Sequence, residues 1–408
     1  MRVLLSGYDS RGGIEPLAAL AAALHALGAE AVACVPPDEE FAQRFHSIGV
    51  PVVPVGKSLH ALVTGAEKPT AAGLPQRAAE LVAAQFAQLA PVARECDAVV
   101  ATGVMPAVAG ARSVAEKLGL AYSYATFQQL TLPTPHHPPR LTTPGEPFPP
   151  DVKDNRALWD LEGRNINALL GEVLNTQRKS IGLSPVDHVR EYVITRQPLL
   201  ATDPVLDPWQ ESADLGVVRT GAWVLPDERP LPSELVAFLE AGAPPVYVGF
   251  GSMPMRGSQD GARVIIEAVR AQGRRVVVSR GWAGLSLIDS GADCLAIGEV
   301  NQQALFGRVA AVVHHGGAGT THTAARAGAP QVVVPQGADQ PYWAGRVTDL
   351  GIGAAHDGPI ATVESLSAAL KAALTPRTHT RAKAVAATMS ADGAMVAAKL
   401  VLDQISVK

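Results

Sequence analysis

Charge is scarce in this sequence. Only 18% of its 408 residues are Asp, Glu, Lys or Arg, the formal net charge is −4, and Lys and Arg form no long run. Without a basic patch, the sequence gives little support to a surface for nucleic acid or for an anionic membrane. Because 47% of the residues are hydrophobic, a disordered chain is excluded and a well-filled globular protein is expected. A small neutral or anionic ligand fits this composition.

Cysteines and long apolar stretches are scarce as well. Cys34, Cys96 and Cys294 are far apart, which fits neither a disulfide framework nor a zinc site. We expect three buried thiols in a reducing compartment. The apolar stretch 17–29 is interrupted by His25 and is too short to span a bilayer, and the apolar start of the chain is too short for a signal peptide. These absences predict a soluble cytoplasmic protein.

Several catalytic motifs are absent or incomplete. A GxGxxG dinucleotide motif that would begin at Gly249 has Pro254 in place of its third glycine, and a P-loop that would end at Ser58 has Pro51 in place of its first. No GxSxG nucleophile elbow occurs, and no two aspartates stand two positions apart as in a metal-binding DxD motif. Oxidoreductase, P-loop and esterase interpretations therefore lose support.

Apolar strands alternate with helix-length segments in two separate stretches. This rhythm predicts an α/β protein with two doubly wound parallel sheets. The predicted strands are 3–6, 31–35, 52–55, 98–102 and 121–125 in the first stretch, and 246–250, 275–279, 294–297, 310–314 and 331–335 in the second. The predicted order is a domain at 1–204, a Pro/Asp-rich linker at 205–232, a second domain at 233–390 and a terminal helix within 391–408 that packs back on the first domain. Ligands of such sheets bind at the carboxyl ends of the strands, which predicts a site in a cleft between the domains.

Two segments of the first domain interrupt the rhythm. Residues 126–150 contain eight prolines, at positions 133, 135, 138, 139, 144, 147, 149 and 150, and are predicted to form an irregular loop. The stretch 55–75 is also predicted to be irregular. Long loops inside compact domains are usually functional, so both are candidate binding loops.

The strongest candidate site is at 312–322, where an apolar strand runs into a glycine-rich turn and then a helix. Backbone N–H groups and the positive end of a helix dipole would meet there at a sheet edge, which suits an anion without a metal. The expected contributors are Gly316, Gly317 and Gly319 for close approach of a phosphate, Thr320 for a hydroxyl, and His315 for a ring N–H. The alternative is a tight turn with incidental histidines.

A second polar turn follows the next predicted strand. Asp339 and Gln340 offer a carboxylate and an amide, which are suited to vicinal sugar hydroxyls. A phosphate cradle followed by such a pair is the arrangement that a nucleotide-sugar site needs.

Residues 314–346 resemble the donor-site signature of the GT-B, family 1 glycosyltransferases, and the likeness continues through 1–5, 227–231 and 246–252. Within that family the chain resembles the actinobacterial enzymes of vancomycin- and teicoplanin-type glycopeptide antibiotic biosynthesis. The resemblance implies a GT-B fold with two Rossmann-like domains, the N-terminal one for a heptapeptide aglycone and the C-terminal one for a UDP- or TDP-sugar. It implies no metal or other cofactor, and no nucleic-acid or membrane partner.

The resemblance also implies roles for individual residues. His315 would contact the α-phosphate, and Gly316, Gly317, Gly319 and Thr320 would contact the diphosphate, with Ser10, Arg11 and Ser252 approaching from the cleft. Asp339 and Gln340 would hold the sugar. Trp282 stands where the nucleoside-binding loop begins, although a core tryptophan is an alternative. Gln340 and the plain His-His-Gly-Gly form resemble the UDP-glucose users more than the TDP-deoxysugar users.

One departure from the family concerns the general base. The family usually has Ser-Arg-Gly-Asp after its first strand, with that Asp as the base, whereas Gly13 stands at its position here. Asp9, Glu15 and Asp339 are possible substitutes, and we rank Asp9 and Asp339 above Glu15 as the catalytic carboxylate. Asp9 could instead be a solvated turn residue.

The implied reaction is an inverting, metal-independent transfer of a sugar, with glucose from UDP-glucose as the favoured donor. Two alternatives are a weakly active homologue that binds nucleotide sugar without efficient transfer, motivated by Gly13, and a nucleotide-sugar epimerase on the same fold. Recombination between two family members at the linker is a further hypothesis on the origin of the chain.

Overall fold

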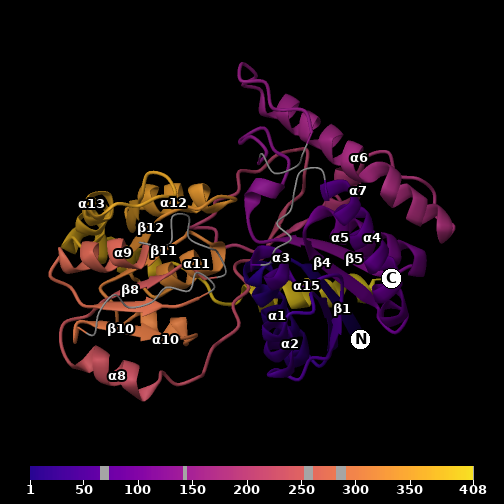
Figure 1. Cartoon of the computed structure of the whole chain (residues 1–408). Helices are drawn as coiled ribbons and strands as arrows, with labels where there is room; N and C mark the ends of the chain where they lie inside the picture. The colour runs from indigo at the N-terminus through magenta and orange to yellow at the C-terminus, as the bar shows by residue number, and fades with distance from the viewer. Residues whose placement is uncertain (65–72, 141–144, 252–260, 282–290, 408) are drawn as a thin grey trace. The chain divides into compact units, whose positions relative to one another are not determined.

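The computed structural model describes residues 1–64, 73–140, 145–251, 261–281 and 291–407. Contacts within the chain divide it into two compact units, whose helices and strands are labelled in Figure 1. Unit 1 contains Met1–Thr202, Trp209–Leu225 and Ser390–Lys408, and unit 2 contains Asp203–Pro208 and Pro226–Met389.

Unit 1 is built on a parallel sheet with the strand order β3-β2-β1-β4-β5-β6-β7. Its strands are β1 Arg2–Tyr8, β2 Glu30–Val35, β3 Val52–Pro54, β4 Ala98–Gly103, β5 Ala121–Thr126, β6 Leu199–Leu200 and β7 Val218–Arg219. Its helices are α1 Arg11–Ala26, α2 Glu39–His46, α3 Leu59–Thr64, α4 Leu74–Ala93, α5 Met105–Leu118, α6 Asn155–Ser180, α7 Val189–Ile194 and α15 Gly393–Ser406, with a 3-10 turn, η2, at Gln129–Thr131. The winding direction reverses between β1 and β4, which is where ligands of such sheets bind.

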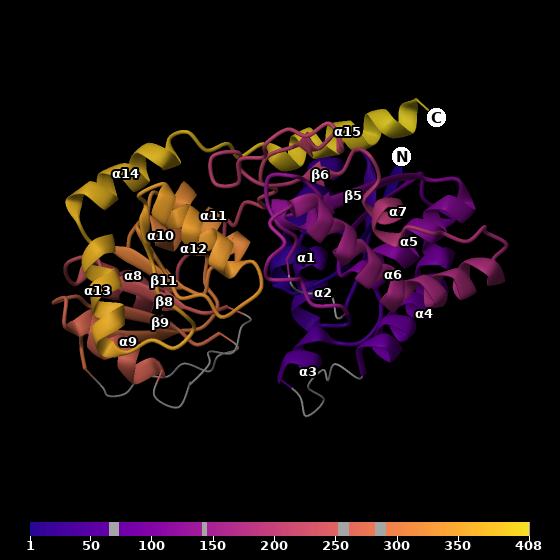
Figure 2. The same cartoon turned by 90° about the horizontal axis from the view of Figure 1, so that it is seen from above.

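Helices cover both faces of this sheet. Val3 and Leu5 of β1 pack into a core that includes side chains of α1 and α15, whereas Leu4 packs into a core with α4 and α5. This alternation follows from the two-residue period of a strand. The terminal helix α15 lies against α1 (Figure 2) and so belongs to the N-terminal unit although it comes last in the chain.

Unit 2 has a parallel sheet with the order β10-β9-β8-β11-β12-β13. Its strands are β8 Val246–Gly249, β9 Val276–Ser279, β10 Cys294–Ile297, β11 Ala311–His314, β12 Gln331–Val333 and β13 Gly353–Ala355. Its helices are α8 Ser233–Glu240, α9 Gly261–Arg270, α10 Gln302–Phe306, α11 Ala318–Arg326, α12 Gln340–Asp349, α13 Val363–Ala373 and α14 Pro376–Ala386. Here the winding reverses between β8 and β11.

The prediction of two doubly wound α/β domains is confirmed, and the three cysteines are buried and free. The segment expected as a linker, 205–232, is divided between the units: residues up to 208 and from 226 belong to unit 2, and 209–225 belong to unit 1. The middle part packs with unit 1 because it contributes the buried residues Trp209 and Trp223 and the edge strand β7. The stretch 55–75 is not irregular throughout, since it contains α3 and the start of α4.

Candidate active site

The switch point of unit 2 brings two glycine-rich turns together. Gly251 follows β8, and His315, Gly316 and Gly317 follow β11. A Cβ added at Gly251 would lie 3.2 Å from Cε1 of His315, so a side chain at position 251 would press on the His315 ring. Gly251 also has a φ of +58°, a conformation that favours glycine. Ser252, expected at the phosphates, and Trp282, expected at the nucleoside, lie outside the described residues.

The side chain of His314, the last residue of β11, holds the turn that follows the strand. The Gly316 N–H donates to Nδ1 of His314 (3.1 Å), and Nε2 lies 2.9 Å from Oε1 of Gln331, whose amide donates to the carbonyl of Thr321. Burial and the neighbouring His315 lower the pKa of His314 to about 3, so the ring is neutral with its proton on Nε2. Its role is therefore to orient the Gly316 peptide, which has a φ of +92°.

His315 has a buried polar atom without a partner. The residue is 9% exposed, and among the described residues nothing hydrogen-bonds its Nδ1. Burial lowers the pKa of His315 to about 4, so its ring is neutral at physiological pH. A Cβ at Gly317 would lie 2.6 Å from Nε2, so the absence of a side chain there lets the ring pack against the turn. An unsatisfied buried nitrogen costs stability unless a ligand supplies the partner.

The start of α11 is open. Its N-cap is Gly317, which offers no side chain for the free N–H groups of the first turn. Gly319 is exposed, and a Cβ added there would meet nothing within 4 Å. The hydroxyls of Thr321 and Thr323 donate back to carbonyls four residues earlier, whereas Thr320 is half-buried in the first turn. Within the described part of the chain, the first-turn N–H groups of α11 have no side-chain partner, and the helix start carries positive potential at the sheet edge.

The two polar side chains predicted to contact a sugar, in the turn after β12, each have one oxygen engaged within the protein. Oε1 of Gln340 accepts from the N–H groups of Gln336 (2.6 Å) and Gly337 (3.2 Å), and the residue is 3% exposed. Gln340 therefore holds its own turn, in which Ala338 has a φ of +56°. Asp339 is half-buried at the N-cap of α12, with Oδ2 accepting from the indole of Trp343.

The switch point of unit 1 carries a carboxylate. Asp9 follows β1, and its Oδ1 accepts from the N–H of Ser10 (2.6 Å), the N-cap of α1. A Cβ at Gly13 would lie 2.5 Å from Cβ and 2.7 Å from Oδ2 of Asp9. The Asp9 side chain thus occupies the space that a side chain at position 13 would take. Ser10 is exposed and Arg11 is half-buried at the start of the helix.

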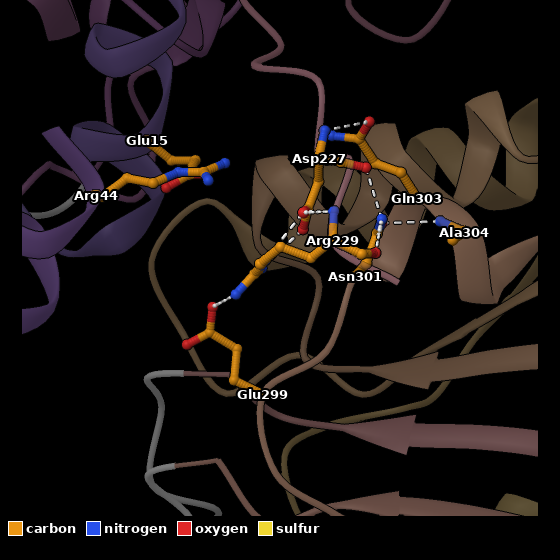
Figure 3. Close-up of polar contacts among 8 residues, drawn as sticks. All are labelled: Glu15, Arg44, Asp227, Arg229, Glu299, Asn301, Gln303 and Ala304. Carbon is orange, nitrogen blue, oxygen red and sulfur yellow. Dashed lines mark hydrogen bonds and ion pairs between the residues drawn. The ribbon is translucent and has the colours of Figure 1, made fainter. Parts of the chain in front are cut away.

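Glu15, the lower-ranked carboxylate, is paired within unit 1. It forms an ion pair with Arg44 of α2, drawn in Figure 3.

A polar cluster of unit 2 was missed by the sequence reasoning. Asn301, at the start of α10, donates to the carbonyls of Asp227 (2.6 Å) and Arg229 (2.9 Å) and accepts from Ala304 N–H (Figure 3). Hydrogen bonds to Asp227 raise the pKa of Arg229. The cluster fastens the segment before α8 to the loop after β10. One indication of this cluster was present in the sequence, the family resemblance at 227–231, but that resemblance did not say what these residues contact.

The described residues contain no cluster of three or more His, Cys, Asp or Glu side chains placed to hold a metal ion. No helix in the same part of the chain has the length and apolar character needed to cross a membrane.

Two Rossmann-like units, the second with a glycine-rich strand-to-helix turn at its switch point, are the architecture of the GT-B glycosyltransferases. Residues 284–401 match the family model described as "Erythromycin biosynthesis protein CIII-like, C-terminal domain". The chain is 54% identical over 406 residues to "Vancomycin aglycone glucosyltransferase" of Amycolatopsis orientalis, covering 100% of this chain and 98% of the relative. It is 50% identical to "dTDP-epi-vancosaminyltransferase" of the same organism, covering 100% and 98%. Among solved structures, the glycotransferase of kitacinnamycin aligns with a TM-score of 0.74 at 20% identity, over 99% of this chain and 98% of that one.

The chain belongs to the GT-B glycosyltransferase family of glycopeptide antibiotic pathways, and it is an enzyme of that family. The resemblance inferred from residues 314–346 is thereby confirmed.

Proposed function

We propose that this glycosyltransferase transfers glucose from UDP-glucose to a hydroxyl of a glycopeptide aglycone, with inversion at the anomeric carbon and without a metal. The observation that carries the proposal is His315, whose buried Nδ1 lacks a partner among the described residues beside the open start of α11. The name of the relative at 54% identity supports the acceptor class and the sugar. The relative at 50% identity is named for a different sugar, so the donor is the part of the proposal that most needs a test.

In this proposal unit 2 binds the donor. His315 contacts the α-phosphate, and the turn Gly316–Gly317 with Gly319 and Thr320 binds the diphosphate through N–H groups and a hydroxyl. Asp339 accepts from a sugar hydroxyl, while Gln340 supports the turn that carries Asp339. Ser252 as a further phosphate contact and Trp282 as the nucleoside contact stay part of the proposal.

Unit 1 binds the acceptor, and Asp9 is the general base. The support is the space at Gly13, which Asp9 fills with its own carboxylate, so that a carboxylate is present although position 13 has none. Asp9 also lies at the reversal of winding in unit 1, where ligands of such sheets bind. Ser10 and Arg11, next in the chain, are proposed to assist at the phosphates.

The reaction is a single displacement. The acceptor oxygen forms a bond to the anomeric carbon, the bond from that carbon to the phosphate oxygen breaks, and the acceptor proton passes to Asp9. Negative charge develops on the departing diphosphate, where the N–H groups of α11 and the ring of His315 stabilise it. These neutral donors provide the stabilisation that a divalent metal provides in other sites.

A transfer assay read by mass spectrometry tests the proposal. The full chain is incubated with a glycopeptide aglycone, EDTA and one of three donors: UDP-glucose, UDP-N-acetylglucosamine or a TDP-deoxysugar. We expect the aglycone to gain one hexose from UDP-glucose, with NMR of the product showing the inverted anomer. Product formed from the TDP-deoxysugar alone would show that the proposed donor is wrong. Activity that appears only in a parallel incubation without EDTA would overturn the metal-free mechanism. A donor converted to another sugar without aglycone would indicate an epimerase instead.

A further inference from the structure

The carboxylate of Asp339 is held by a tryptophan on its own helix. Trp343 lies four residues later on α12, one turn along and on the same face, and its Nε1 donates to Oδ2 of Asp339 at 2.8 Å. An indole nitrogen can only donate, so this contact always occupies a carboxylate oxygen. Within the described residues, Oδ1 of Asp339 has no hydrogen-bond partner. Oδ2 of Asp339 is therefore held by Trp343 of the same helix, and Oδ1 can accept a hydrogen bond from a ligand.

The indole itself cannot turn away. Trp343 is fully buried (0% exposed) among apolar side chains that include Val333 of β12 and Val347 of α12. The ring of His322 meets it edge-on with centroids 5.2 Å apart, and that of Tyr342 does so at 5.1 Å. Close packing on several sides leaves a large ring one orientation.

His322 is in turn fixed at both of its nitrogens. The N–H of Asp203 donates to Nε2 (3.3 Å), so Nδ1 carries the proton and donates to the carbonyl of Ala318 (2.7 Å). Burial lowers the pKa of His322, which keeps the ring neutral. Because Ala318 is the first residue of α11, the same ring connects the start of α11 with the tryptophan behind Asp339.

We propose that Trp343 is a positioning residue for the transferred sugar. By holding Oδ2, it directs Oδ1 of Asp339 toward one hydroxyl of the sugar and makes the carboxylate a directional acceptor. The inference rests on the proposed role of Asp339 as a sugar contact. It separates binding of the transferred sugar from binding of the nucleotide. UDP lacks the transferred sugar that would contact Asp339, so the affinity for UDP does not depend on Trp343.

The test is Trp343→Phe, which removes the indole N–H and keeps an aromatic ring. We expect kcat/KM for UDP-glucose to fall about tenfold, the loss typical of a hydrogen bond to a charged group, while the Kd for UDP stays within about twofold. A general structural defect would weaken UDP binding as well. The matched control is Trp223→Phe in unit 1, which also removes a buried indole N–H, donated to Thr220 at 2.9 Å, and should leave both quantities unchanged.

A double-mutant cycle shows whether Trp343 acts through Asp339. We expect Asp339→Ala to lower kcat/KM and the double variant to be no worse than Asp339→Ala alone. If Asp339→Ala has no effect, the proposed sugar contact itself is wrong. If Asp339→Ala is impaired but Trp343→Phe is not, or if the two losses add, only the positioning role is wrong.

A measurement on the unmutated protein covers the case in which Trp343→Phe does not fold. The indole N–H resonance of Trp343 is assigned as the one that moves in Asp339→Ala. We expect that resonance to shift when UDP-glucose binds and to stay in place when UDP binds. Equal shifts with both ligands, or no shift with UDP-glucose, would overturn the inference.

Discussion

Each unit has a glycine-rich strand-to-helix turn at its switch point, but the two turns are filled differently. In unit 1 the carboxylate of Asp9 accepts from the Ser10 N–H at the start of α1 and fills the space beside Gly13. Neither helix has a side-chain cap bond at its N-cap residue, but in unit 2 no described residue fills the space at Gly319. A carboxylate of the protein lies at the first helix start, whereas we propose that a ligand supplies the anion at the second.

The comparison shows that glycine has two uses in such turns. At Gly13 the missing side chain makes room for a carboxylate four residues earlier in the chain, and at Gly319 it makes room for nothing that the described chain supplies. A sequence pattern treats both as flexible turn residues. Only the neighbours of each missing Cβ show that a carboxylate fills the space at Gly13 and that no described residue fills the space at Gly319.

Removing the carboxylate at the start of α1 in unit 1 should have the largest effect on turnover. Asp9→Asn should lower kcat by about 10²–10⁴-fold, the usual contribution of a general base, with the Kd for UDP unchanged because unit 2 is intact. Turnover at saturating UDP-glucose and titration calorimetry with UDP measure the two quantities. Unchanged kcat would remove Asp9 from the mechanism.

A carboxylate swap sharpens this test. Gly13→Asp alone should be damaging, since the new Cβ would lie 2.5 Å from Cβ of Asp9. When Asp9 is replaced by glycine, the side chain introduced by Gly13→Asp has room. The double variant should therefore have a kcat at least about tenfold higher than that of Asp9→Gly alone. Glu15→Gln is the control, because Glu15 is paired with Arg44 and should contribute little to turnover. No recovery in the double variant would mean that position 13 cannot replace Asp9.

Acid should affect unit 2 through its buried histidines. Burial lowers the pKa of His314 to about 3 and that of His315 to about 4, whereas an unfolded histidine titrates near 6.5. Between those values the unfolded chain binds more protons, so stability rises with pH. It is fully present above about pH 6.5 and falls below that by about 1.4 kcal/mol per pH unit for each histidine. Urea unfolding at pH 7, 6 and 5 should show this loss.

Hydrogen exchange assigns the loss to a unit. Protection of β11 and β12 should fall with acid more than protection of β1 and β4, which lie in the other unit. His314→Asn should be less stable than the parent at pH 7, because it breaks the contacts to Gly316 and Gln331, but should depend less on pH. An equal pH slope in this variant would contradict the assignment.

Much of this arrangement was predictable from the sequence, and the exceptions have physical reasons. The strands β8 and β11 and the turn after β11 were predicted because runs of apolar residues and clustered glycines are local signals. The strands β6 and β7 were missed because two residues each are too few to show a period. The cluster around Asn301 depends on segments far apart in the sequence, which no local pattern joins.

Side-chain roles were harder to predict than positions. Gln340 was predicted to hold a sugar, and that stays a prediction. Its amide oxygen accepts from backbone N–H groups of the turn, which leaves the amide nitrogen for such a contact. Trp343 stands four residues after Asp339, a spacing that places the two on one helix face and could have indicated their contact. That Asp9 fills the space of position 13 could not be predicted, since it depends on the backbone path of the turn.

The smallest effect is expected for Gly319→Ala. This substitution should not lower the melting temperature, but it should weaken the binding of UDP. Alanine is favoured over glycine within helices by up to about 1 kcal/mol, so Gly319→Ala should leave the melting temperature equal or higher. The added methyl group would occupy the open space at the start of α11, so the Kd for UDP should rise about tenfold if a phosphate binds there. Gly171→Ala, on α6 of unit 1, is the matched control: its Cβ also meets nothing within 4 Å, and it should raise the melting temperature without changing UDP binding. Unchanged UDP binding in Gly319→Ala would mean that the open space is an ordinary helix surface, and the contrast between the two helix starts would then rest on His315 alone.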